Sequence, residues 1–129
     1  MRFYLVDDDP LMVKLQSRIL MNAGHEVAWE TDSTIAMDAI IGNKPDCVIT
    51  DLMMPGVDGY QLITQIRKET SLDHTVVIVL SAKAFMQDKR QALDFGASGF
   101  IRKPVDPVTF LDKVREVIEK AMPGRGVEV

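Results

Sequence analysis

Acidic side chains gather behind two short apolar segments of this 129-residue chain. Asp7 and Asp8 follow the first segment, and Asp51 follows a later one. Like charges at close range are costly, and the repulsion is relieved by proton uptake, by solvent exposure or by a divalent cation. Carboxylate oxygens suit Mg²⁺, which keeps several waters and takes one or two carboxylates. If folding brings the two segments together, these acids could attract such an ion.

Asp51 is the strongest candidate for covalent chemistry. It ends an apolar run and is followed by residues 52–59, a loop rich in proline and glycine. A carboxylate can attack phosphorus to give an aspartyl phosphate when a cation screens the approach of two anions. Asp8 could help to hold that cation. Asp9, in contrast, directly precedes Pro10 and is expected only to cap a helix.

Two further side chains could grip a phosphoryl group. Ser81 ends a fourth apolar segment, and its hydroxyl could donate to a phosphate oxygen on Asp51, with small Ala82 beside it leaving room. Lys103 ends a fifth segment, and a charge-assisted bond from its ammonium to phosphate would contribute about 1.5–3 kcal/mol. Taken alone, such a serine is more often a turn residue and such a lysine solvated surface. Their shared position at strand ends favours the functional interpretation.

Five apolar segments have the length and spacing of strands. They are residues 3–6, 26–29, 47–50, 76–80 and 99–101. The first, third and fourth are apolar almost throughout, which is typical of parallel strands covered on both faces. The stretches between them have helical periodicity, so strand and helix alternate five times. This pattern predicts an α/β fold: a doubly wound, five-stranded parallel sheet with helices on both faces.

Short polar residues and glycines mark the predicted helix ends. The expected N-caps are Asp9, Asp32 or Ser33, Asp58, and Asp106 ahead of Pro107. The expected stops are Gly24, Gly42 and Gly96. In the first helix, Leu11, Leu15 and Ile19 are expected to face the core. In a parallel sheet, ligands collect at the carboxyl ends of the strands, so the candidate residues should converge there.

Composition limits the function classes. The net charge of −4 and pI near 5.1 argue against direct binding of nucleic acid. No apolar run approaches the roughly 20 residues that cross a bilayer, so we expect no membrane partner. The one cysteine, Cys47, lies in an apolar run and suits a reducing compartment, so we expect a cytoplasmic protein. Residues 1–121 are predicted to form one domain and residues 122–129 a flexible tail or linker stub.

The ordered set Asp7, Asp8, Asp51, Ser81 and Lys103 resembles the receiver domain of two-component response regulators. The sequence Met54-Pro55-x-x-Asp58-Gly59 and the pair Lys103-Pro104 strengthen the resemblance, which covers about residues 2–121. It implies a flavodoxin-like fold with strand order 2-1-3-4-5, an order that is known for the chemotaxis receiver.

The resemblance also implies roles. Asp51 would accept a phosphoryl group from a sensor histidine kinase or phosphotransfer protein. Asp8, Asp51 and the backbone carbonyl of Met53 would bind Mg²⁺ directly, with Mn²⁺ as a second candidate ion, and Asp7 would act largely through water. Ser81 and Lys103 would grip the phosphate. Such a domain is a phosphoacceptor in signalling and not an enzyme acting on other substrates.

The same resemblance assigns a switch and an output surface. Phe100 stands where the family keeps an aromatic that follows the movement of Ser81. The surface of the fourth helix, fifth strand and fifth helix would then contact an output domain, a target protein or a second copy in a homodimer. Met53 and Lys83 occupy variable positions that tune the phosphate lifetime. Since Met53 cannot orient a water, slow self-dephosphorylation is expected.

Three alternatives remain at this point. Asp7-x-Asp9 resembles the nucleophile and acid of a haloacid-dehalogenase-type phosphatase, but Pro10 and Leu11 replace the glycine and threonine of that family. A flavin-binding module would need a phosphate-binding loop after the first strand, which is not seen. A receiver used only for docking, without phosphorylation, would not need the complete acid, hydroxyl and lysine set.

Overall fold

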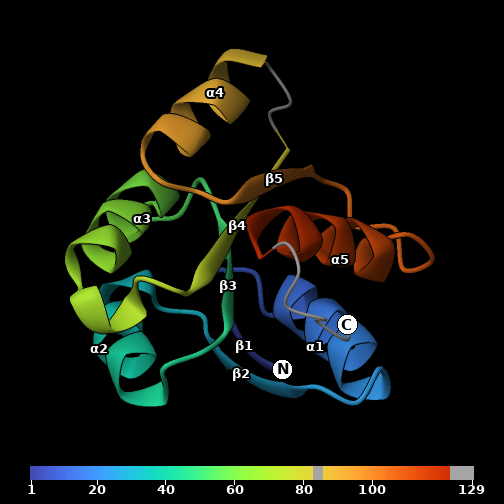
Figure 1. The fold of residues 1–129 in the computed structure, drawn as a ribbon. Helices are drawn as coiled ribbons and strands as arrows, with labels where there is room; N and C mark the ends of the chain where they lie inside the picture. Colours follow the sequence, from blue (N-terminus) through green and yellow to red (C-terminus); the bar gives the residue numbers. More distant parts are fainter. Residues whose placement is uncertain (83–85, 123–129) are drawn as a thin grey trace.

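A computed structural model describes the backbone of residues 1–82 and 86–122, and the side chains of these residues except 86–88. Within them, strands and helices alternate as predicted (Figure 1). The strands are β1 (Arg2–Val6), β2 (Glu26–Glu30), β3 (Cys47–Asp51), β4 (Val76–Ser81) and β5 (Gly99–Arg102). The helices are α1 (Pro10–Asn22), α2 (Ser33–Asn43), α3 (Gly59–Lys68), α4 (Met86–Asp94) and α5 (Phe110–Ala121), with a short 3₁₀ helix, η1 (Thr70–Leu72), before β4.

The strands form one parallel sheet in the order β2-β1-β3-β4-β5, which confirms the predicted order. Val6 at the end of β1 pairs with Thr50 of β3, and Asp51 pairs with Leu80 of β4. Because each neighbouring pair is parallel, the carboxyl ends of the strands lie along the same edge. Residues that follow β1, β3, β4 and β5 therefore meet at that edge.

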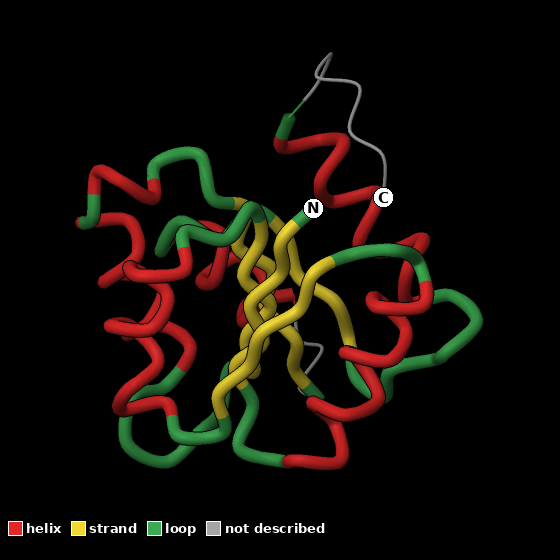
Figure 2. The backbone as a smooth tube through the Cα atoms, turned by 90° about the horizontal axis from the view of Figure 1, so that it is seen from below, coloured by secondary structure: helices red, strands yellow, loops and turns green. Residues whose placement is uncertain are grey.

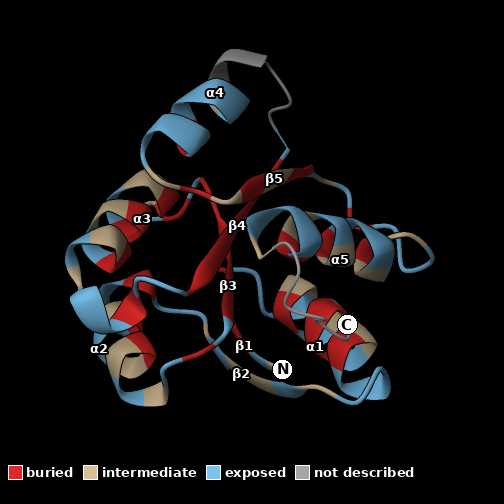
Figure 3. Ribbon diagram, viewed as in Figure 1, coloured by how far each residue is buried: buried red, intermediate tan, exposed pale blue. Residues whose placement is uncertain are grey.

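Helices cover both faces of the sheet, as predicted (Figure 1; Figure 2). α1 and α5 pack on one face, where Leu20 and Phe110 are buried against the strands. α2, α3 and α4 lie over the other, where Ile40 and Leu62 are buried. β3 and β4 are buried along their whole length (Figure 3). No helix in the described part of the chain has the length and apolar character needed to cross a lipid bilayer.

Three predicted helix starts are confirmed. The Asp9 carboxylate accepts a hydrogen bond from the Leu11 amide at 3.0 Å, with proline in the first turn of α1. Asp32 caps α2 in the same way. Asp58 forms a complete capping box with Gln61 at the start of α3. These caps fix the points at which three of the loops at the carboxyl edge turn into helix.

The predicted start of α5 was wrong. Asp106 does not cap the helix, which begins at Phe110 with Thr109 as its N-cap. The Asp106 carboxylate instead accepts from the Val108 amide at 2.9 Å, inside a turn that precedes the helix. An Asp-Pro pair starts a turn as readily as a helix, and here the turn forms first.

Two details of α1 and α2 also differ from the expectation. Leu11 is 76% exposed, while the buried face of α1 consists of Val13, Gln16, Ser17 and Leu20. Leu15 and Ile19 are partly buried and pack against the core as expected, but apolar periodicity could not reveal that the polar residues Gln16 and Ser17 are buried as well. Gly42 does not end α2, which runs to Asn43 and closes with Lys44 at a φ of 49°. The next residue is Pro45, which has no N–H to continue the helix.

Candidate functional site

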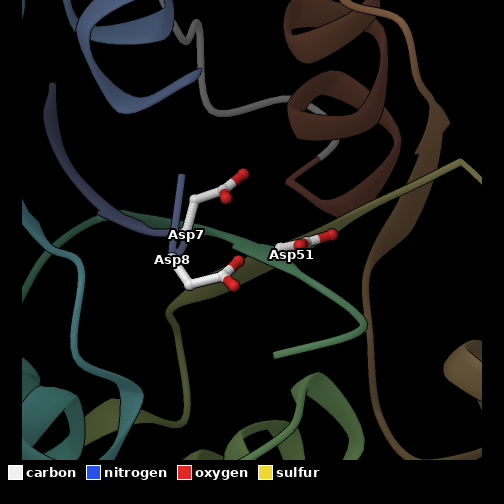
Figure 4. A group of neighbouring side chains, drawn as sticks. All are labelled: Asp7, Asp8 and Asp51. Atoms are coloured by element: carbon white, nitrogen blue, oxygen red, sulfur yellow. The ribbon is translucent and has the colours of Figure 1, made fainter. Parts of the chain in front are cut away.

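Three carboxylates meet at the carboxyl edge of the sheet (Figure 4). Asp7 and Asp8 directly follow β1, and Asp51 is the last residue of β3. One oxygen from each lies within 4.8 Å of the others. Asp7 and Asp51 are 1% and 8% exposed, whereas Asp8 is open to solvent. Hard oxygen donors at this spacing fit a small divalent cation, with the side of Asp8 facing water.

Lys103 bridges the two buried acids. Its Nζ lies 3.2 Å from Asp7 Oδ2 and 3.2 Å from Asp51 Oδ1. The residue directly follows β5, two strands away from β3, and its backbone amide donates to the Ser81 carbonyl at 2.8 Å. One ammonium thus balances part of the charge of three carboxylates.

Burial and charge act in opposite directions on the ionisable groups of this site. Burial raises the pKa of Asp7 and of Asp51 above the ordinary aspartate value, although Lys103 pulls both in the opposite direction. Burial alone would lower the pKa of Lys103, but attraction to the two carboxylates outweighs it and raises that pKa. A cation beside these oxygens would stabilise their ionised form. The donor set therefore fits Mg²⁺ in both chemistry and charge.

A hollow of about 340 Å³ opens beside Asp51. Its walls are Asp51, Met53, Ser81, Ala82 and Lys103. Ser81 is 2% exposed, and the small Ala82 next to it leaves the hollow open. Met53 is 58% exposed and presents an apolar side chain. The structure thus places a carboxylate, a hydroxyl and an ammonium around a space that a phosphoryl group could enter.

The loop after Asp51 is fixed by the backbone and by Gly59. The Asp51 Oδ1 atom accepts from the Leu52 amide at 2.9 Å, and the Gly59 amide donates to the Leu52 carbonyl at 2.8 Å. A Cβ on Gly59 would lie 2.7 Å from the Asp51 carbonyl oxygen. Sequence reasoning gave Gly59 no role of its own. One signal in the sequence could have pointed to it: glycine weakens a helix, so a glycine in the first turn of a predicted helix suggests that a side chain would not fit there.

Phe100 lies apart from this hollow. It is half-buried on β5 and packs against the core between the sheet and α2–α4. It also lines a second hollow of about 270 Å³ on the outer surface of β5 and α5. Its role as a switch stays a prediction. Lys83, the other residue expected to tune phosphate lifetime, lies outside the described residues.

Comparison with known proteins decides the family. A model of the response regulator receiver domain matches residues 3–115. The chain is a member of the receiver domain family. The rival phosphatase is not favoured, because Asp9 is engaged in capping α1 while Asp51 stands in the acid cluster. Receiver domains are phosphoacceptor signalling domains, and the other two alternatives are not favoured either.

Relatives of this receiver domain include longer regulators. It is 32% identical over 119 residues to the DNA-binding dual master transcriptional regulator RpaA of Synechocystis, covering 92% of this chain and 49% of that protein. It is 38% identical over 119 residues to the transcriptional regulatory protein YbdJ of Bacillus subtilis, covering 92% and 51%. The chain thus spans about half the length of these curated relatives.

Solved structures give the same result. The receiver domain matches chemotaxis protein CheY4 of Vibrio cholerae with a TM-score of 0.85 at 26% identity, covering 90% of this chain and 97% of that one. It matches the receiver domain of NarL from Mycobacterium tuberculosis with a TM-score of 0.82 at 31% identity, covering 92% and 95%. The predicted flavodoxin-like architecture is therefore confirmed.

Proposed function

We propose that this receiver domain accepts a phosphoryl group on Asp51 from a sensor histidine kinase or a phosphotransfer protein. An Asp51 carboxylate oxygen forms a bond to phosphorus while the bond from phosphorus to the donor's imidazole nitrogen breaks. The observation that carries this proposal is the convergence of Asp7, Asp8 and Asp51 with Lys103 beside one open hollow.

The metal ligands in this proposal are Asp8, Asp51 and the Met53 carbonyl, with Asp7 acting largely through water. Bound Mg²⁺ supplies charge screening, so that an anionic phosphoryl group can approach an anionic carboxylate. Asp7 holds Lys103 in place at 3.2 Å and accepts from the Asp9 amide at 2.9 Å, which orients its carboxylate. Mn²⁺ prefers the same oxygen ligands and is the second candidate ion.

Phosphorylation would redistribute the contacts of Lys103 and Ser81. In the structure, the Lys103 ammonium forms ion pairs with both Asp7 and Asp51. A phosphoryl group on Asp51 offers new anionic oxygens to the ammonium and to the Ser81 hydroxyl, because both line the same hollow. Movement of Ser81 towards the phosphate would leave space next to β5. Phe100 of β5 is the proposed switch residue, whose aromatic ring would turn inward into that space.

The proposed output surface comprises α4, β5 and α5. Its hollow is lined by four basic side chains, Lys89, Arg102, Lys113 and Lys120, against one acid, Glu116. Phe100 and Val117 supply an apolar floor. In a chain of net charge −4 this is a local basic site, so it fits a partner that presents acidic residues around an apolar side chain. That partner is an output domain or a separate target protein.

A homodimer through the same surface is the second candidate assembly. The surface carries charges of both signs that could form ion pairs across a two-fold axis, among them Asp112 and Arg115 of α5, which lie 3.0 Å apart as an ion pair within the helix. Sedimentation of the wild-type protein with and without beryllium fluoride and Mg²⁺ tests this assembly. A mass that doubles only with the phosphate mimic supports it, and an unchanged monomer mass excludes it at the concentration used.

We also propose that the domain works in the cytoplasm. The free, buried Cys47 suits a reducing compartment. The names of the longer relatives, which include transcriptional regulators, support an output step inside the cell.

The direct test of phosphoryl acceptance uses acetyl phosphate with Mg²⁺. Intact-mass measurement should show the gain of one phosphoryl group in wild type, none in Asp51→Asn, and none in wild type after the metal is removed with a chelator. A gain that persists in Asp51→Asn would contradict the assignment.

The lifetime of the phosphate gives a second test. Met53 borders the hollow but offers no polar side-chain group to orient an attacking water, so self-dephosphorylation should be slow. Loss of the label from purified protein should take minutes or longer, and Met53→Glu should shorten it. Complete loss from wild type within seconds would contradict this expectation.

A further inference from the structure

A buried serine at the start of α2 is tied to the loop that follows Asp51. Ser33 is 4% exposed. Its Oγ donates to the Pro55 carbonyl at 2.9 Å and accepts from the Val57 amide at 3.1 Å. One hydroxyl thereby holds the backbone on both sides of Gly56, across 22 and 24 residues of sequence.

Gly56 brings this loop into direct contact with α2. Its φ is 82°, a conformation that side-chain-bearing residues rarely adopt, and a Cβ built there would lie 2.7 Å from Thr34 Cγ2 and 3.6 Å from Ser33 Oγ. The loop therefore rests against the first turn of α2 with no space between them.

The start of α2 is itself fixed. The Asp32 carboxylate accepts from the Thr34 amide at 3.0 Å and from the Thr34 hydroxyl at 2.6 Å. The carboxylate of Glu30, at the end of β2, accepts from the amides of Thr31 and Asp32, each at 3.0 Å. Ser33 thus projects from a capped helix end that is anchored to the sheet.

The other end of the loop is anchored at the acid cluster. The Leu52 amide donates both to Asp51 Oδ1 at 2.9 Å and to the Leu80 carbonyl at 3.0 Å. Met54 is 8% exposed and belongs to the core. Met53 therefore lies between one anchor at Leu52 and a second anchor formed by Met54 and the Ser33 contacts.

We propose that Ser33 is a positioning residue for Mg²⁺: its hydroxyl holds residues 55–57 in place and thereby fixes the backbone of the loop that carries the Met53 carbonyl. This inference rests on the proposed function, in which that carbonyl is a metal ligand. Side chains that orient a metal ligand typically contribute 10–100-fold to metal affinity. Ser33→Ala should therefore weaken Mg²⁺ binding about tenfold.

The experiment measures Mg²⁺ affinity by calorimetric titration of the full chain. Two control variants remove buried hydroxyls elsewhere. Ser17→Ala deletes a hydroxyl that donates within α1, to the Lys14 carbonyl at 3.2 Å. Thr75→Val deletes one that ties the loop before β4 to the Pro45 carbonyl at 3.1 Å, at the opposite edge of the sheet. Both controls should keep the wild-type Mg²⁺ affinity, and Thr75→Val should lower thermal stability as Ser33→Ala does.

A second variant perturbs the same contact from the loop side. Gly56→Ala should push the loop away from Thr34 and weaken Mg²⁺ binding as Ser33→Ala does. In both variants the rate of phosphorylation by acetyl phosphate should approach the wild-type rate once Mg²⁺ is saturating, because the substitutions reduce the affinity for the metal and leave the reacting groups unchanged. A general loss of structure would lower the rate at every Mg²⁺ concentration.

The outcomes separate this inference from the proposed function. If Ser33→Ala and Gly56→Ala bind Mg²⁺ within twofold of wild type, or if Thr75→Val weakens binding equally, Ser33 is not a positioning residue. If wild type shows no Mg²⁺ binding that depends on Asp8, the proposed function itself fails. Should Ser33→Ala not fold, the result for Gly56→Ala decides.

Discussion

At the scale of single residues, the central feature is that buried carboxylates outnumber the amine that balances them. Asp7 and Asp51 are nearly inaccessible, and Lys103 serves both. Because burial raises the pKa of each acid, folding without a metal makes both carboxylates harder to ionise than they are in the unfolded chain. The two buried carboxylates, which allow the site to bind a cation, therefore lower the stability of the metal-free domain near neutral pH.

Asp7→Asn should make the metal-free domain more stable at pH 7. A carboxyl group whose pKa is raised by folding contributes stability below its unfolded pKa, and this contribution is lost as pH rises through the folded pKa. Asparagine removes that loss and keeps an oxygen for the Asp9 amide, which now bonds to Asp7 at 2.9 Å. Urea unfolding in the presence of a chelator, at pH 7 and at pH 4, measures the difference in unfolding free energy between Asp7→Asn and wild type. The advantage of Asp7→Asn should be smaller at pH 4. An Asp7→Asn variant that is less stable than wild type at pH 7 would contradict the account.

His25 should give a pH dependence of the opposite sign. Its ring packs edge-on against Phe3 with centroids 5.1 Å apart, and burial lowers its pKa below the ordinary 6.5. The neutral ring is favoured in the fold, so its contribution is present above pH 6.5 and is lost as pH falls through the folded pKa. Between pH 7 and pH 5, wild type should lose more unfolding free energy than His25→Gln. Equal losses for the two proteins in urea unfolding at these two pH values would contradict this expectation.

At the scale of elements, caps and close backbone contacts decide where each functional residue stands. Asp58 starts α3 with a capping box, and Gly59 lets that helix begin against the backbone of Asp51 and Leu52. The sequence predicted the strands, the caps at Asp9 and Asp58, and the convergence at one edge, because these depend on local pattern. It did not predict that Gln16 and Ser17 are buried in α1, because both are polar. It also did not predict the Ser33 contacts, which join residues distant in sequence.

Gly59→Ala should destabilise the domain by about 1–3 kcal/mol. The added Cβ would stand 2.7 Å from the Asp51 carbonyl oxygen and 2.8 Å from Leu52 Cα, which are backbone atoms that cannot turn aside. Gly42→Ala is the matched control in α2, where nothing lies within 4 Å. It should stabilise by about 0.5–1 kcal/mol, because alanine suits a helix interior better than glycine. Equal effects in urea unfolding would refute the close contact at Gly59.

At the scale of the whole molecule, the two helical layers hold a sheet whose carboxyl edge carries the acid cluster and whose outer strand, β5, borders the basic hollow. Lys103 directly follows β5 and bonds to both buried acids, so it connects the cluster to the strand that carries Phe100. A change of charge on Asp51 can therefore reach the proposed output surface through a single strand. Strand order and the family's roles came from resemblance, whereas the charge balance around Lys103 required the structure.

Site mapping of the acyl phosphate tests the central claim most directly. Wild-type protein is phosphorylated with acetyl phosphate and Mg²⁺, the acyl phosphate is reduced with borohydride, and the peptides are sequenced by mass spectrometry. The account predicts one modified residue, Asp51. Modification at Asp7 or Asp8 instead, or labelling that does not require Mg²⁺, would contradict it.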